Sequence, residues 1–83
     1  MVYVGIDVAK DKHDCFIVNS EGEVLYDVFT IQNNISGFED LLFKIKTVEQ
    51  DPDKVKVGLE ATGHYSCNIL GFLKTVGLET IVI

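Results

Sequence analysis

The stretch of sequence that decides the fold is Val55–Tyr65, which reads VKVGLEATGHY. Its first half alternates apolar residues with others, which is typical of a β-strand with one buried face. That strand ends on an acid, Glu60, and the Ala-Thr-Gly that follows predicts a turn. An apolar stripe at helical spacing comes next. The local order is therefore strand, acid, turn and helix, with Glu60 at the carboxyl end of the strand.

The start of the chain has a similar arrangement. Residues 2–7 read VYVGID, an alternating β-branched strand that ends in Asp7. Both faces of this strand are fairly apolar, which favours a central strand covered on both sides. Two acids at the ends of two strands predict a shared metal ion if the fold makes those strands neighbours.

The other elements decide whether they are neighbours. The predicted elements are strands 2–7, 13–19 and 24–31, a helix from 36 to 48, a strand 54–59, a helix 64–76 and a strand 79–83. Short polar connections make the first three strands antiparallel neighbours. Ser36 and Glu39 form a predicted capping box at the first helix, and Gly77 ends the second.

This βββαβαβ order predicts an α/β fold. Right-handed crossovers through the two helices make the later strand pairs parallel, and the sheet order that satisfies this is 3-2-1-4-5. Asp7 and Glu60 then end on adjacent parallel strands, whose backbones lie ~4.8 Å apart. The chain direction switches at this point, and such switch points are where α/β sheets bind ligands.

Composition limits the partners. The chain has 83 residues, enough for one domain, with 47% hydrophobic residues and a net charge of −6 from thirteen acids and seven lysines. A metal-free DNA-binding module is usually basic, so contact with nucleic acid requires a metal ion or a further part of the protein. Two widely spaced cysteines predict free thiols in a reducing compartment. With no membrane-length apolar run and no visible signal peptide, we expect a cytoplasmic protein.

The last residues, Thr80–Ile83, form a bare apolar strand with no turn or covering helix after it. We therefore expect residues 1–83 to be the N-terminal piece of a longer protein, and we expect the isolated chain to self-associate through exposed edges.

The carboxylate pair predicts specific chemistry. Two acids at one sheet edge repel each other, and a cation between them relieves the repulsion. Asp and Glu oxygens suit Mg²⁺ or Mn²⁺, whose open positions take substrate phosphates. Two such ions about 3.5–4 Å apart support phosphodiester cleavage, but they need more than two carboxylates. The alternative is that both acids are solvated strand ends near a helix start.

These residues also resemble a known family. VGIDVAKDKH at 4–13 and GLEATGHY at 58–65 resemble the N-terminal half of the DEDD transposase domain of the IS110 insertion-sequence family. Residues 31–33 and 37–38 fit the same pattern, so the resemblance covers essentially the whole chain, and EATGHY is its most specific part. The family domain is similar to the Holliday-junction resolvase RuvC, which implies an RNase H-like fold.

The resemblance implies a function. It assigns Asp7 to the first D and Glu60 to the E of four catalytic acids, which bind two Mg²⁺ or Mn²⁺ ions in the full-length protein. It implies a DNA transposase that cleaves and transfers strands, works with an element-encoded guide RNA and acts as a homo-oligomer. The last two acids, and a C-terminal domain with a serine important for strand exchange, lie beyond Ile83. The fragment is therefore expected to be inactive alone.

The remaining polar residues have weaker interpretations. In the connector, Asp11, Lys10 and Lys12 are expected to be solvated rather than to contact metal or phosphate. His13 is expected to be a strand residue rather than a ligand. Downstream of Glu60, the candidates are Thr62 as a helix cap, Gly63 for a tight turn or a phosphate approach, His64 for either positioning or packing, and Tyr65 for packing rather than base stacking.

Two other classes stay open. The actin, sugar-kinase and chaperone ATPases share the βββαβαβ unit and a Gly-Ile-Asp start, but they hold phosphate on a first hairpin turn with Gly and hydroxyl residues. Here that connector reads VAKDK at 8–12, with neither. The third class is a structural oligomerisation module.

Overall fold

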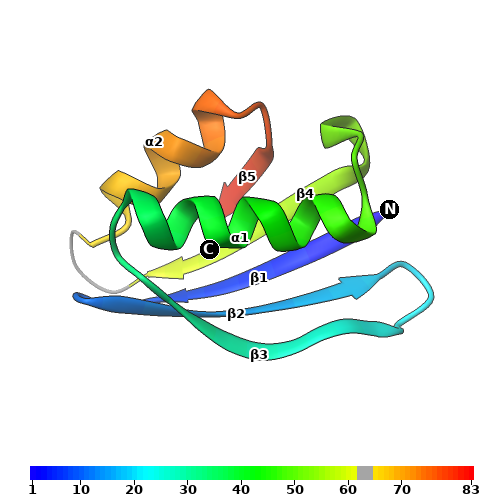
Figure 1. Ribbon diagram of the computed structural model, residues 1–83, viewed down its shortest axis with the longest axis horizontal. Coiled ribbons are helices and arrows are strands. Elements are labelled where there is room, and N and C mark those ends of the chain that lie inside the picture. The colour runs from blue at the N-terminus through cyan, green and yellow to red at the C-terminus, as the bar shows by residue number, and fades with distance from the viewer. Residues whose placement is uncertain (62–64) are drawn as a thin grey trace.

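Five strands form a single mixed sheet in the order β3-β2-β1-β4-β5, with both helices on one of its faces (Figure 1). The structure is a computed structural model that describes residues 1–61 and 65–83. Its elements are β1 (Val2–Val8), β2 (Lys12–Asn19), β3 (Val24–Gln32), α1 (Ile35–Val48), the 3₁₀ turn η1 (Pro52–Lys54), β4 (Val55–Ala61), α2 (Cys67–Thr75) and β5 (Glu79–Val82). The predicted α/β class and sheet order are confirmed.

Strand directions follow the connection rules. β1 is the central strand, antiparallel to β2 and parallel to β4, and β4 is parallel to β5. The β1–β2 and β2–β3 connections are short, so these strands pair antiparallel, whereas α1 and α2 carry the chain back over the sheet and make the later pairs parallel. The change of direction therefore falls between β2 and β4, at β1.

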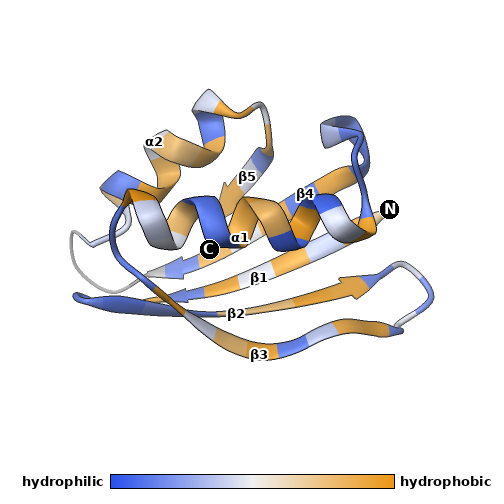
Figure 2. Ribbon diagram, viewed as in Figure 1, coloured by the Kyte–Doolittle hydropathy of each residue, from blue (hydrophilic) through white to orange (hydrophobic). Residues whose placement is uncertain are grey.

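The core lies between the sheet and the two helices. Alternate residues of β1 face it: Val2, Val4, Ile6 and Val8 are buried. The helices contribute Phe38, Leu41, Ile45, Ile69 and Leu73 to the same cluster. These are the helical stripes that the spacing predicts, and in Figure 2 hydrophobic and hydrophilic segments alternate along the strands and helices.

The opposite face of the sheet is open in the described residues. Tyr3 is 42% exposed and Asp7 is also exposed, so β1 is central but is covered on one side. The expectation of a strand covered on both faces is not met here. This open face carries both candidate acids.

The helices begin at other residues than the sequence predicts. Asn34 is the N-cap of α1, where its Oδ1 accepts a 2.9 Å hydrogen bond from the Gly37 N–H. Ser36 and Glu39 lie inside the helix, so the predicted capping box is wrong. Asn and Ser are about equally good caps, but the backbone is extended at Asn34, as a cap requires, and already helical at Ser36. α2 begins at Cys67, three residues after the predicted His64.

Candidate metal centre

Asp7 and Glu60 lie side by side on the open face. They are partners in the parallel register between β1 and β4, one residue before the end of each strand. Their neighbours Ile6 and Leu59 are buried, so the alternation of strand side chains sends both acids to the exposed face. The predicted placement of the two acids on neighbouring strands is confirmed, and their role as metal ligands stays a prediction.

A third carboxylate, which the sequence interpretation missed, is that of Asp14. With Asp7 and Glu60 it forms the acid row, which crosses β2, β1 and β4. Asp14 is the antiparallel partner of Asp7 on β2, and it too is exposed. Its Oδ1 accepts a 2.7 Å hydrogen bond from the Thr30 hydroxyl on β3, the side away from β1. The hairpin register could have revealed Asp14, because a short connector between β1 and β2 fixes which residues pair.

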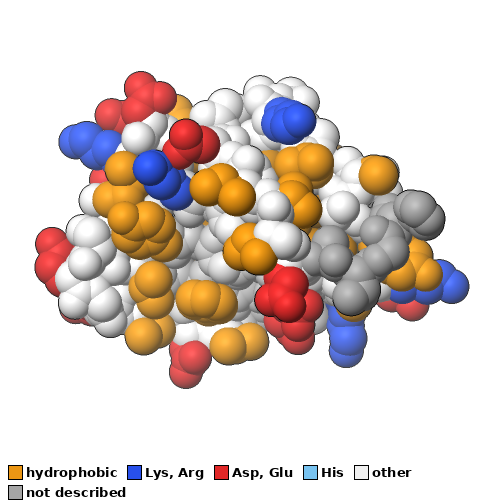
Figure 3. All heavy atoms as spheres, turned by 180° about the vertical axis from the view of Figure 1, so that it is seen from behind, with side chains coloured by type: hydrophobic (Ala, Val, Ile, Leu, Met, Phe, Trp, Pro, Cys, Tyr) orange, Lys and Arg blue, Asp and Glu red, His pale blue; other side chains and the backbone are white. Residues whose placement is uncertain are grey.

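The acids border a hollow in the open face. This depression, of about 430 Å³, has the following lining residues: Gly5, Ile6, Asp7, Asp14, Cys15, Phe16, Val28, Gly58, Glu60 and Ile83. Phe16 covers Gly5 so closely that a Cβ on Gly5 would clash with the ring. In the view from behind, hydrophobic side chains form patches between acidic ones (Figure 3). The hollow is therefore apolar with acids at one end.

The donor set fits a partial metal site. Two carboxylates on adjacent strands supply hard oxygen ligands, and Mg²⁺ is commonly bound through one or two carboxylates with waters and substrate phosphates in the other positions. Within the described residues, no group of three or more His, Cys, Asp or Glu is arranged to hold a metal ion. Asp14, held by Thr30, does not complete a site with the pair. The pair alone can hold an ion loosely and needs further ligands to hold it tightly.

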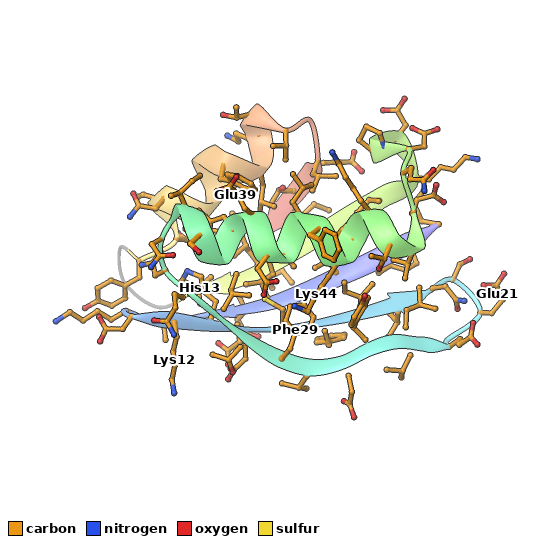
Figure 4. All side chains as sticks on the ribbon, viewed as in Figure 1. Lys12, His13, Glu21, Phe29, Glu39 and Lys44 are labelled. Carbon is orange, nitrogen blue, oxygen red and sulfur yellow. The ribbon has the colours of Figure 1, made fainter. Side chains whose placement is uncertain are left out.

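The connector between β1 and β2 borders this row. Lys10, Asp11 and Lys12 are exposed, and neither lysine forms an ion pair with any residue that the structure describes. His13 is fully buried in β2, as expected for a strand residue. Figure 4 shows His13 between the sheet and α1, whereas Lys12 points to the opposite side of the sheet.

Four candidates follow β4. Thr62, Gly63 and His64, with the cap, turn and positioning roles predicted for them, lie outside the described residues. Tyr65 is 43% exposed, and the packing role that the sequence favours for it stays a prediction.

The comparisons with known proteins decide the family. A model of the IS110-type DEDD transposases, described as a transposase family, matches residues 4–83. The chain belongs to this family. No curated protein matches the chain in sequence. The mixed sheet in the order 3-2-1-4-5 agrees with the RNase H-like fold that the family resemblance implies.

Two solved structures show what the transposase sheet is similar to. The fowlpox virus Holliday junction resolvase matches 100% of this chain and 60% of its own length, with a TM-score of 0.57 and 14% identity. A Bacteroides thetaiotaomicron protein with an actin-like ATPase fold and unknown function matches 99% of this chain and 32% of its own, with a TM-score of 0.75 and 19% identity. The chain thus spans a third to three fifths of these proteins. At such identities the likeness is one of fold.

Neither helix in the described ranges is long and apolar enough to cross a membrane.

Proposed function

We propose that residues 1–83 are the N-terminal part of the catalytic domain of a divalent-metal-dependent DNA transposase, in which Asp7 and Glu60 are metal ligands. The observation that carries this proposal is the parallel register of the two acids on the open face, in a chain of a family named for four acids. The other two acids are supplied by sequence beyond Ile83. The fragment by itself is inactive.

The chemistry follows from the residue types. Bound Mg²⁺ or Mn²⁺ would activate the attacking oxygen and stabilise the leaving oxygen of a phosphodiester. The contribution of this chain is to hold two carboxylates at a fixed separation on neighbouring strands of a rigid sheet. Strands position ligands more closely than loops do, because their backbones are fixed by hydrogen bonds on both sides.

The proposed partners follow from charge and family. A net charge of −6 disfavours direct contact with DNA, so cations at the acid row and the rest of the protein neutralise the phosphates. The full-length protein works with DNA and an element-encoded guide RNA, as a homo-oligomer in the cytoplasm.

Metal binding is testable on this chain. In ¹⁵N-labelled protein, Mn²⁺ should broaden amide signals at the carboxyl ends of β1 and β4 and leave those of α1 sharp. Asp7→Asn and Glu60→Gln should each weaken this effect, because each removes one of two ligands. Glu39→Gln is the matched control, since Glu39 is an exposed acid on α1 (Figure 4). Uniform broadening, or equal effects of all three variants, would refute the site.

Activity is testable in the full-length transposase. Asp7→Asn and Glu60→Gln should abolish strand cleavage while the thermal unfolding temperature stays close to that of the wild type. Glu39→Gln should cleave normally. Full activity of either active-site variant would overturn the proposal.

A second candidate function has one observation in its favour, the likeness to an actin-like ATPase fold. It predicts that ATP raises the unfolding temperature of the full-length protein. The transposase proposal predicts no such shift, since the 8–12 connector lacks the Gly, Ser and Thr residues that cradle phosphate.

A further inference from the structure

The buried histidine of β2 uses one ring nitrogen in a hydrogen bond to a described residue and the other in none. His13 is 0% exposed, and its Nδ1 accepts a 3.2 Å hydrogen bond from the Ala9 N–H. Because Nδ1 is an acceptor, the proton of the neutral ring lies on Nε2. No described residue accepts a hydrogen bond from Nε2, which is buried. An apolar side chain could fill the same space but could not accept the hydrogen bond from the Ala9 N–H, so this bond is what a histidine adds at this position.

Asn33 also has one buried polar atom without a described partner, and two of its other polar groups form hydrogen bonds to the connector. The Asn33 backbone N–H donates to the Asp11 carbonyl over 3.0 Å, and its Nδ2 donates to the Lys10 carbonyl over 2.9 Å. Its Oδ1 is buried and receives no hydrogen bond from any described residue. His13 and Asn33 together therefore bind all three connector residues, Ala9 through Asp11.

The held connector adjoins the acid row. Ala9 comes two residues after Asp7, and His13 is the register partner of Val8, the last residue of β1. The ring of His13 is itself held, parallel to that of Phe38 on α1, with an interplanar angle of 4° and centroids 6.3 Å apart. The hydrogen bond from Ala9 thus ties the end of β1 to the core. A strand end without such a tie frays, and its side chains move with it.

We propose that His13 is a positioning residue for Asp7, acting through the Ala9 N–H, with Asn33 holding the rest of the connector. The inference rests on the proposed metal site, because it concerns how firmly one ligand of that site is placed. Removing a group that orients a metal ligand typically lowers metal affinity about 10–100-fold. His13 touches neither metal nor substrate in this proposal.

Two substitutions of His13 by amide side chains distinguish the roles of its two ring nitrogens. In His13→Asn, the side-chain oxygen takes the place of Nδ1, because both are bonded to Cγ, so the Ala9 hydrogen bond survives. In His13→Gln, the amide reaches the place of Nε2 and leaves Nδ1 without a substitute. His13→Leu removes both groups. Asn33→Ala loosens the same connector independently, with the exposed Asn68→Ala on α2 as its control.

The first measurement is hydrogen exchange of the Ala9 amide in the 83-residue chain. Wild type and His13→Asn should protect this amide, and His13→Gln and His13→Leu should exchange it at least ~10-fold faster. The second is Mn²⁺ affinity, which should fall about 10–100-fold in His13→Gln, His13→Leu and Asn33→Ala but not in His13→Asn. The unfolding temperatures of the variants should not rank in the same order as their Mn²⁺ affinities. If the role of His13 were purely structural, the variants with the lowest affinity would also have the lowest unfolding temperatures.

The outcomes separate the two proposals. If Asp7→Asn leaves Mn²⁺ binding intact, the metal site itself fails. If Asp7→Asn weakens Mn²⁺ binding but His13→Gln and His13→Leu bind as the wild type does, the positioning role is overturned. If these variants do not fold, Asn33→Ala decides, because wild-type affinity with a loosened connector would equally overturn it.

Discussion

Gly37→Ala tests the closest contact between a helix and the sheet. Gly37 is buried near the start of α1, beside the end of β3. A Cβ at this position would lie 2.1 Å from the Gln32 carbonyl oxygen and 2.7 Å from its nitrogen. Both are backbone atoms, which cannot rotate away. Ordinary contacts begin at 3.4 Å, so helix and strand end have to separate by about 1.3 Å.

The magnitude follows from three effects. Alanine has the better helix propensity by about 1 kcal/mol. Against this, forcing a methyl group into a filled site costs about 1–3 kcal/mol. The shift also strains the Asn34 cap. There the Gly37 N–H donates a hydrogen bond to the Asn34 side chain, which contributes about 1 kcal/mol. We expect a net loss of about 2 kcal/mol, a large share of the roughly 4–12 kcal/mol that a chain of this size has.

Urea unfolding followed by far-UV circular dichroism measures this loss, and Gly71→Ala is the matched control. Gly71 lies in α2 and is exposed, and a Cβ added to it would meet no described atom within 4 Å. Alanine there should therefore stabilise the fold by about 0.5–1 kcal/mol. Thermal unfolding should show Gly37→Ala lower than wild type by roughly 8–16 °C. Equal stabilisation by both substitutions would refute the close approach.

Two further predictions concern the cap and the buried thiol. Asn34→Ala should destabilise by about 1 kcal/mol, and Ser36→Ala should be nearly neutral, because the observed cap is Asn34; the reverse order in urea unfolding would restore the capping box. Burial, with a smaller contribution from Asp14, raises the pKa of Cys15 from 9.0 to about 12. Its contribution to stability is therefore complete below pH 9 and is lost as pH rises toward 12, by about 1.4 kcal/mol per pH unit. The stability advantage of wild type over Cys15→Ala should shrink between pH 8 and 10.5, and an unchanged advantage would contradict the shift.

The sequence predicts the sheet well because the sheet depends on connection rules. The short connections around Gly22 and at residues 9–11 allow only antiparallel pairing, and the helical crossovers allow only parallel pairing. The placement of Asp7 beside Glu60 follows from that order alone. These inferences need hydrophobic periodicity and chain length, and both can be read from a single sequence.

Individual atomic contacts were not predictable. Even over four or five residues, the sequence pattern does not show that Gly37 meets the Gln32 backbone or that His13 accepts from Ala9, because both contacts depend on the path of the backbone between the two residues. The cap was misplaced for a related reason: Asn34 and Ser36 are both acceptable caps, and the end of β3 selects the first. The expected self-association stays a prediction, although Ile81, Val82 and Ile83 on and beside β5 are exposed.

The sheet by itself does not decide the function, since a Holliday junction resolvase and a protein with an actin-like ATPase fold are both similar to this chain in structure. The proposal for a metal-dependent transposase rests on the side chains at the carboxyl end of β1. A nucleotide phosphate needs backbone N–H groups and hydroxyls in the first turn, and here the Ala9 N–H is already bound by His13. Asp14, Asp7 and Glu60 instead form a row of negative charge on the open face. Such a row repels the phosphates of a nucleotide and of DNA alike, so the proposed transposase function requires a cation to bind this edge before DNA or together with it.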